Sequence, residues 1–185
     1  PIGDHDAVPS STDYAGVIID SRNDGKTAQM FLSNPHGVQY DAINSDVSGE
    51  DSAPDFFWES AGRMTPTGWS LEIRIPFSSL RYSEGAEPAW GILLYRNYPR
   101  DRRYQFFNTR LPRDVNCFIC NSSTLNGLAN LPQGQHLVVA PFATAGRNSA
   151  PRAGLGTPLV DDKIETETGV DVKWNPLANT AIDGT

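Results

Sequence analysis

The chain has 185 residues, which is enough for one hydrophobic core and a smaller appendage. With 22 acidic residues against 15 lysines and arginines, its net charge of −7 argues against binding to nucleic-acid phosphates. We expect no transmembrane helix, because the sequence contains no run of eighteen apolar residues. The 16 glycines and 14 prolines favour short strands joined by many turns.

The first part of the chain is predicted to form a meander of antiparallel strands. Residues 14–20 are a short apolar run, 28–33 are the return strand, and 38–43 are a third strand. Asn23-Asp24-Gly25 predicts a tight hairpin turn between the first two, because these residue types tolerate positive φ. Nothing in this region has the period of a helix, so the sequence indicates an all-β domain.

The clearest strand pattern lies within Gly68–Leu80. Apolar and polar residues alternate there with a period of two, which predicts one buried face and one exposed polar face. The apolar set is Trp69, Leu71, Ile73 and Ile75, and the polar set is Ser70, Glu72 and Arg74. Residues 57–60 are expected to form the other arm of a hairpin, with a turn at 65–68. Pro76 ends the strand because it cannot donate a ladder hydrogen bond.

The following region is predicted to add a central strand and a loop with two cysteines. Residues 88–96 are apolar on both faces, which is typical of a strand inside a sheet. Cys117 and Cys120 stand in a loop-like segment, without the two further ligands of a zinc site or the strand-then-helix context of a redox motif. We expect a local disulfide in an exported protein, and two free thiols are the alternative.

Composition changes after Leu131-Pro132, so we divide the chain into residues 1–133 and 134–185. Residues 136–145 and 165–174 have β-type patterns, and 180–185 begin another strand. In an isolated chain, Val170, Val172 and Trp174 would then lie on an unpaired edge and favour self-association.

Several motifs, in their order along the chain, resemble one known family. They are Asp13–Lys26, Asn34–Asp41, Trp58-Glu59, Gly68–Arg81 and Trp90-Gly91-Ile92 with Arg96. Together they resemble the carbohydrate-binding-module family 9-like domain that precedes the β-barrel of a bacterial outer-membrane family, the DUF5916 type. Strands that the family places before residue 13, and the barrel expected after Thr185, are absent, so the resemblance implies an internal fragment.

The resemblance implies an antiparallel β-sandwich over residues 1–133 and the first barrel strands over 134–185. It also implies a location in the outer membrane or periplasm of a Gram-negative bacterium. The expected ligand is an oligosaccharide or other glycan, held by aromatic faces and charge-assisted hydrogen bonds. The candidate contacts are Glu72, Arg74, Arg96 and Trp58. For Glu72 and Arg74 the alternative is a cross-strand ion pair at the surface. Trp69 and Trp90 are expected in the core.

A calcium site and a catalytic site are two further hypotheses. Asp20, Asn23 and Asp24 offer the oxygen ligands that Ca²⁺ prefers, although the hairpin turn alone also explains them. Glu59 and Glu72 lie on the two arms of one hairpin and could act as the carboxylate pair of a glycoside hydrolase. We expect a non-catalytic module, with the hydrolase as the alternative.

Six arginines and only one acidic residue, Asp101, lie between Arg96 and Arg113. A solvated hairpin with local ion pairs explains this segment, and the alternative is a contact surface for anionic sugars or lipid head groups. The same segment also fits a structural module that plugs or gates its own barrel.

Overall fold

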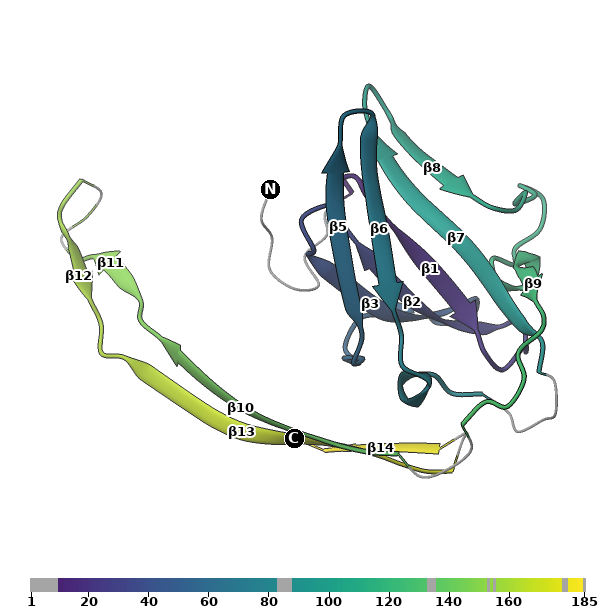
Figure 1. Ribbon diagram of the computed structural model, residues 1–185. Coiled ribbons are helices and arrows are strands. Elements are labelled where there is room, and N and C mark those ends of the chain that lie inside the picture. The colour runs from purple at the N-terminus through teal and green to yellow at the C-terminus, as the bar shows by residue number, and fades with distance from the viewer. Residues whose placement is uncertain are drawn as a thin grey trace. The chain divides into compact units, whose positions relative to one another are not determined.

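The computed structural model is all-β and antiparallel, with a sandwich-like arrangement, which confirms the predicted fold class (Figure 1). It describes residues 10–82, 88–132, 136–152, 154, 156–177 and 180–184. The chain divides into two compact units, unit 1 (residues 1–133) and unit 2 (residues 134–185). The boundary itself, residues 133–135, lies outside the described residues. In the described part of the chain, no helix has both the length and the apolar character needed to cross a membrane.

Most of unit 1 is one seven-stranded antiparallel sheet, with the order β4-β3-β2-β1-β7-β8 and with β9 paired to β7. Its strands are β1 (Tyr14–Asp20), β2 (Thr27–Ser33), β3 (Gln39–Ser45), β4 (Gly49–Asp51), β7 (Trp90–Pro99), β8 (Arg103–Phe107) and β9 (Ser123–Leu125). The meander of the first three strands and the internal position of β7 are therefore both as predicted.

A separate hairpin of β5 (Glu59–Thr65) and β6 (Gly68–Arg74) lies in front of the large sheet in Figure 1. The first arm was expected at residues 57–60, but it begins at Glu59, and Trp58 before it is buried in the core. After β6, Pro76 precedes the short 3-10 turn η1 (Phe77–Ser79). The hairpin prediction is thus confirmed with a shifted first strand.

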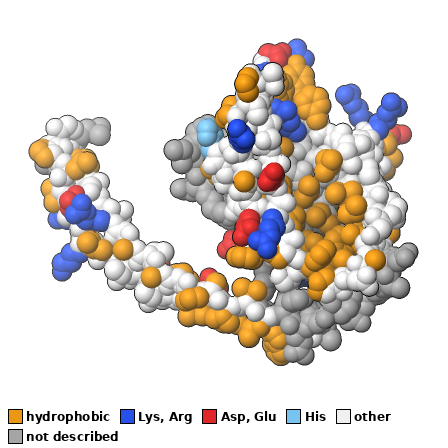
Figure 2. Space-filling model, viewed as in Figure 1, with side chains coloured by type: hydrophobic (Ala, Val, Ile, Leu, Met, Phe, Trp, Pro, Cys, Tyr) orange, Lys and Arg blue, Asp and Glu red, His pale blue; other side chains and the backbone are white. Residues whose placement is uncertain are grey.

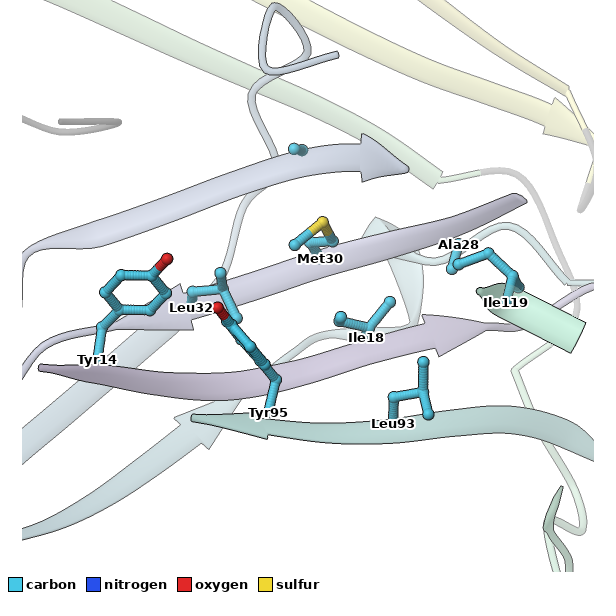
Figure 3. Close-up of a cluster of buried hydrophobic side chains, with 9 residues drawn as sticks. Tyr14, Ile18, Ala28, Met30, Leu32, Leu93, Tyr95 and Ile119 are labelled. Atoms are coloured by element: carbon cyan, nitrogen blue, oxygen red, sulfur yellow. The ribbon is translucent and has the colours of Figure 1, made fainter. Parts of the chain in front are cut away.

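Each face of the seven-stranded sheet carries its own core, because alternate side chains of a strand point to opposite faces. On β1, Ile19 belongs to the core that the hairpin covers and Ile18 to the core on the other face. The hairpin-side core comprises Ile19, Phe31, Phe56, Trp58, Leu80, Tyr82, Trp90 and Leu131. The far-side core, shown in Figure 3, comprises Tyr14, Ile18, Ala28, Met30, Leu32, Ala42, Leu93, Tyr95 and Ile119.

The hairpin packs closely on the turn between β2 and β3. A Cβ atom added to Gly62 would lie 2.4 Å from the carbonyl oxygen of Pro35, so only glycine allows this approach without a shift. Beyond the hairpin, apolar side chains of the large sheet reach solvent, and Figure 2 shows hydrophobic side chains gathered on this face. Leu94 and Phe106 are 49% and 53% exposed there. The hairpin therefore covers only part of the sheet.

Unit 2 is a long β-ribbon with a smaller hairpin. Its strands are β10 (His136–Gly146), β11 (Ser149–Pro151), β12 (Leu159–Asp161), β13 (Glu165–Leu177) and β14 (Thr180–Gly184). β13 lies between β10 and β14 in a three-stranded sheet. The expectation that Val172 and Trp174 lie on an unpaired edge is therefore wrong, because both pair with residues of both neighbours. Self-association and the origin of these strands in a membrane domain stay predictions.

Candidate functional site

The outer face of the hairpin carries two of the predicted sugar contacts as exposed side chains. Arg74 Nη1 lies 3.0 Å from Glu59 Oε2, and the two side chains are 77% and 57% exposed. The register places Glu59 opposite Arg74 and Ala61 opposite Glu72. Arg74 thus forms the cross-strand surface ion pair that was the alternative prediction, with Glu59 as its partner.

Trp58 does not fit the predicted role of a sugar platform, because it is a core residue. Its side chain is only 5% exposed, and its indole Nε1–H donates to Asp41 Oδ2 at 2.7 Å. The Phe31 ring packs edge-on against it, with the ring centroids 5.5 Å apart. Its ring is therefore closed to a soluble ligand. Trp90, expected in the core, is 3% exposed and lies there.

Arg96 is held on the inner side of the hairpin, away from Glu72 and Arg74. Its Nε and Nη2 donate to the two carboxylate oxygens of Asp13 at 3.1 and 3.0 Å, and its guanidinium lies 5.4 Å from the Trp69 ring centroid. The hydrogen bond to Asp13 raises the pKa of Arg96 above its ordinary value. Because Trp69 and the pair Glu72/Arg74 occupy opposite faces of β6, the predicted contacts do not converge on one site.

The predicted calcium ligands close the turn between β1 and β2. The Asp20 carboxylate is buried and accepts the backbone N–H of Asp24 at 3.3 Å and of Gly25 at 2.8 Å. Asp24 Oδ1 accepts the N–H of Thr27 at 3.0 Å, and Asn23 adopts φ 54°. No group of three or more His, Cys, Asp or Glu side chains that could hold a metal ion occurs in the described ranges. The turn accounts for these residues, and calcium binding stays a prediction.

The loop with the two cysteines is tied to the sheet. Cys117 and Cys120 form a disulfide, with their Cα atoms 5.8 Å apart. The Asp46 carboxylate accepts the N–H groups of Phe118 and Ile119 at 3.0 and 3.1 Å. These contacts seat Ile119 in the far-side core and place the Phe118 ring beside it.

A pocket that the sequence did not predict lies on this far side of the sheet. We call it the aromatic pocket; its volume is about 440 Å³, within the range of small-ligand sites. Its rings are Tyr14, Tyr40, Tyr95, Phe107 and Phe118, and its polar side chains are Asn44, Glu50, Arg103 and Gln105. The rings pack on one another; the centroid of Phe107 lies 5.1 Å from that of Tyr95 and 5.6 Å from that of Phe118. Such edge-to-face and tilted contacts hold the walls in place.

A hydrogen-bonded network links the polar groups at the β8 end of the aromatic pocket. Arg103 Nε donates to Asn97 Oδ1 at 2.7 Å, and Asn97 is itself fully buried. Arg103 Nη2 lies 3.4 Å from the hydroxyls of both Tyr14 and Tyr95, whose neighbouring rings appear in Figure 3. Gln105 Nε2 donates to the Tyr95 hydroxyl at 2.7 Å.

The position of Tyr14 in the aromatic pocket changes its pKa. Burial is the main cause that raises its pKa to about 12, and the neighbouring Tyr95 hydroxyl adds to it. Tyr14 is therefore a neutral hydroxyl at physiological pH and can donate or accept a hydrogen bond. At the other end of the pocket, the Tyr40 hydroxyl donates to Glu50 Oε1.

Neither carboxylate of the predicted hydrolase pair lines the aromatic pocket. Glu59 is engaged by Arg74, and Glu72 is exposed on the outer face of the hairpin. The sequence did contain one signal for the pocket, since Arg103, Gln105 and Phe107 alternate along β8 and so share a face. That signal identifies a site only when the partner strands are known.

The chain matches no family model, no curated protein and no solved structure.

Proposed function

We propose that unit 1 is a non-catalytic carbohydrate-binding module whose ligand occupies the aromatic pocket. The observation that carries the proposal is a ligand-sized pocket that combines five aromatic rings with hydrogen-bonding groups at both ends. The C–H face of a pyranose packs on aromatic rings, while its hydroxyls need charged or polar partners. This pocket offers both kinds of contact.

The polar network favours a sugar over a purely apolar ligand. Arg103 and Gln105 stand at one end of the pocket and Glu50 at the other. An apolar ligand that covered them would displace water without replacing its hydrogen bonds, which costs about 1–3 kcal/mol for each group left without a partner. A ligand with several hydroxyls supplies those bonds instead.

The acidic groups of the pocket favour a binding function over hydrolysis. Glycoside hydrolases use two carboxyl groups, typically about 5–10 Å apart. Of the described residues that line the aromatic pocket, only Glu50 carries a carboxylate. The resemblance to family 9-like modules further supports this function, and with it a location in the outer membrane or periplasm.

Titration calorimetry with a panel of neutral and acidic oligosaccharides tests the proposal. Phe107→Ala should weaken binding about 10- to 100-fold, because a ring buried against a ligand contributes about 1.5–3 kcal/mol. Phe106→Ala is the matched control, because Phe106 is the neighbouring residue on the opposite face of β8 and is 53% exposed. It should bind like the wild type.

A second variant separates the pocket from the hairpin site that the sequence predicted. Glu72→Ala changes an exposed side chain outside the pocket and should leave binding unchanged. Thermal melting confirms that each variant is folded. The proposal fails if the folded wild type binds no oligosaccharide, or if Glu72→Ala abolishes binding while Phe107→Ala does not.

A further inference from the structure

Arg103 differs from Arg96 and Arg100, which precede it in the chain, in how its charge is balanced. Asp13 lies 3.0 Å from Arg96 Nη2 and 3.5 Å from Arg100 Nη2, so one carboxylate serves both. Within the described ranges, no ion pair involves Arg103. Its partners are the amide oxygen of Asn97 and two tyrosine hydroxyls, which orient the guanidinium but carry no negative charge.

Hydrogen bonds orient the Arg103 guanidinium and leave N–H groups that can bind an anion. Asn97 is fully buried and is fixed by its own bonds to the carbonyl oxygens of Ser10 and Thr12, at 2.8 and 2.7 Å. Asn97 Oδ1 in turn accepts a hydrogen bond from Arg103 Nε at 2.7 Å and so orients the guanidinium. In the part of the chain that the structure describes, Arg103 Nη1 makes no hydrogen bond, so its N–H groups remain for a ligand. A planar guanidinium with free N–H groups matches the geometry of a carboxylate.

We infer that the ligand of the aromatic pocket is an acidic oligosaccharide, with the carboxylate of a uronic-acid unit on Arg103. This inference rests on the proposed carbohydrate-binding function and specifies its ligand class. The pocket also orients such a ligand. Glu50 lies on β4, at the opposite edge of the sheet from β8, and favours hydroxyl donors there. The acidic end therefore lies at β8 and a neutral, hydroxyl-bearing end toward β4.

The experiment compares acidic oligosaccharides with their methyl esters, which keep the shape of the sugar and lose its charge. The probes are oligogalacturonate and oligomannuronate, each with its ester, titrated into the whole chain. The wild type should bind one of the acids at least about 10-fold more tightly than its ester, since a hydrogen bond to a charged group contributes about 1.5–3 kcal/mol. Higher salt should reduce this preference because salt screens charges.

Arg103→Gln should lower affinity for the acid at least about 10-fold and leave affinity for the ester within a few-fold, whereas Arg103→Lys should retain part of the preference. Arg102→Gln is the matched control, because it removes the same charge from the adjacent residue, which does not line the pocket. It should bind both probes like the wild type. Melting temperatures establish that all variants are folded.

The outcomes separate the ligand class from the function itself. Equal affinity for acid and ester, or binding of neutral oligosaccharides alone, overturns the inference and leaves the carbohydrate-binding proposal standing. Inorganic phosphate that binds at Arg103 as tightly as the acidic sugar also overturns it, because the site would then recognise any anion. No binding of any oligosaccharide by the folded chain overturns both.

Discussion

Replacing Trp58 by phenylalanine should destabilise unit 1 without weakening ligand binding. The change removes the hydrogen bond from the indole Nε1–H to Asp41 Oδ2, which is 2.7 Å long, and Asp41 is fully buried. Loss of a buried bond to a carboxylate costs about 1.5–3 kcal/mol. The smaller ring also leaves space beside Phe31, which adds about 1 kcal/mol. We expect a total loss of about 3 kcal/mol.

Urea unfolding followed by far-UV circular dichroism measures this loss, and a chain of this length should melt about 6–12 °C lower. Trp69→Phe is the matched control. Trp69 Nε1 is buried and has no hydrogen-bond partner among the described residues, so this substitution removes no such bond and should cost less than about 1 kcal/mol. A Trp58→Phe variant as stable as the wild type but unable to bind sugar would refute the reasoning and restore Trp58 as a ligand contact.

Three further predictions concern packing, charge and pH. Gly62→Ala should lower the free energy of unfolding by about 1–3 kcal/mol, because its Cβ would lie 2.4 Å from the Pro35 carbonyl oxygen. Gly146→Ala, which has open space around it, should lower it by under about 0.5 kcal/mol. Equal losses in urea titrations would contradict this prediction. Arg74→Ala should cost less than about 1 kcal/mol in the same assay, because its ion pair is exposed, and a larger loss would contradict that view. Stability should fall as the pH rises from 10 toward 12, because Tyr14, with a folded pKa of about 12, keeps a proton that the unfolded chain loses near pH 10. Unfolding at pH 9 and pH 11 checks this, and a Tyr14→Phe variant with an unchanged pH slope would disprove it.

Local patterns predicted the strands well where neighbouring residues alone decide the structure. Alternation along β6 correctly separated partly buried Trp69 from exposed Arg74, because side chains two residues apart share a face in any extended chain. The turn at Asn23 was equally readable, because its positive φ depends on the residue type itself. The burial of Trp58 could not be predicted in this way, because Trp58 precedes β5 and no alternating pattern assigns its side chain to a face.

The sequence by itself thus determined the antiparallel β character, the meander and the two faces of the hairpin strand, all of which follow from residues close together in the chain. Only the tertiary structure decided where a ligand fits. Tyr14 and Arg103 are 89 residues apart and meet because β1 and β8 both pair with β7. Glu72 and Arg96, both predicted in one site, are separated because the β5–β6 hairpin turns the Trp69 face of β6 toward Arg96 and the Glu72 face outward. A pocket built from such contacts depends on strand order and register, which a local pattern does not specify.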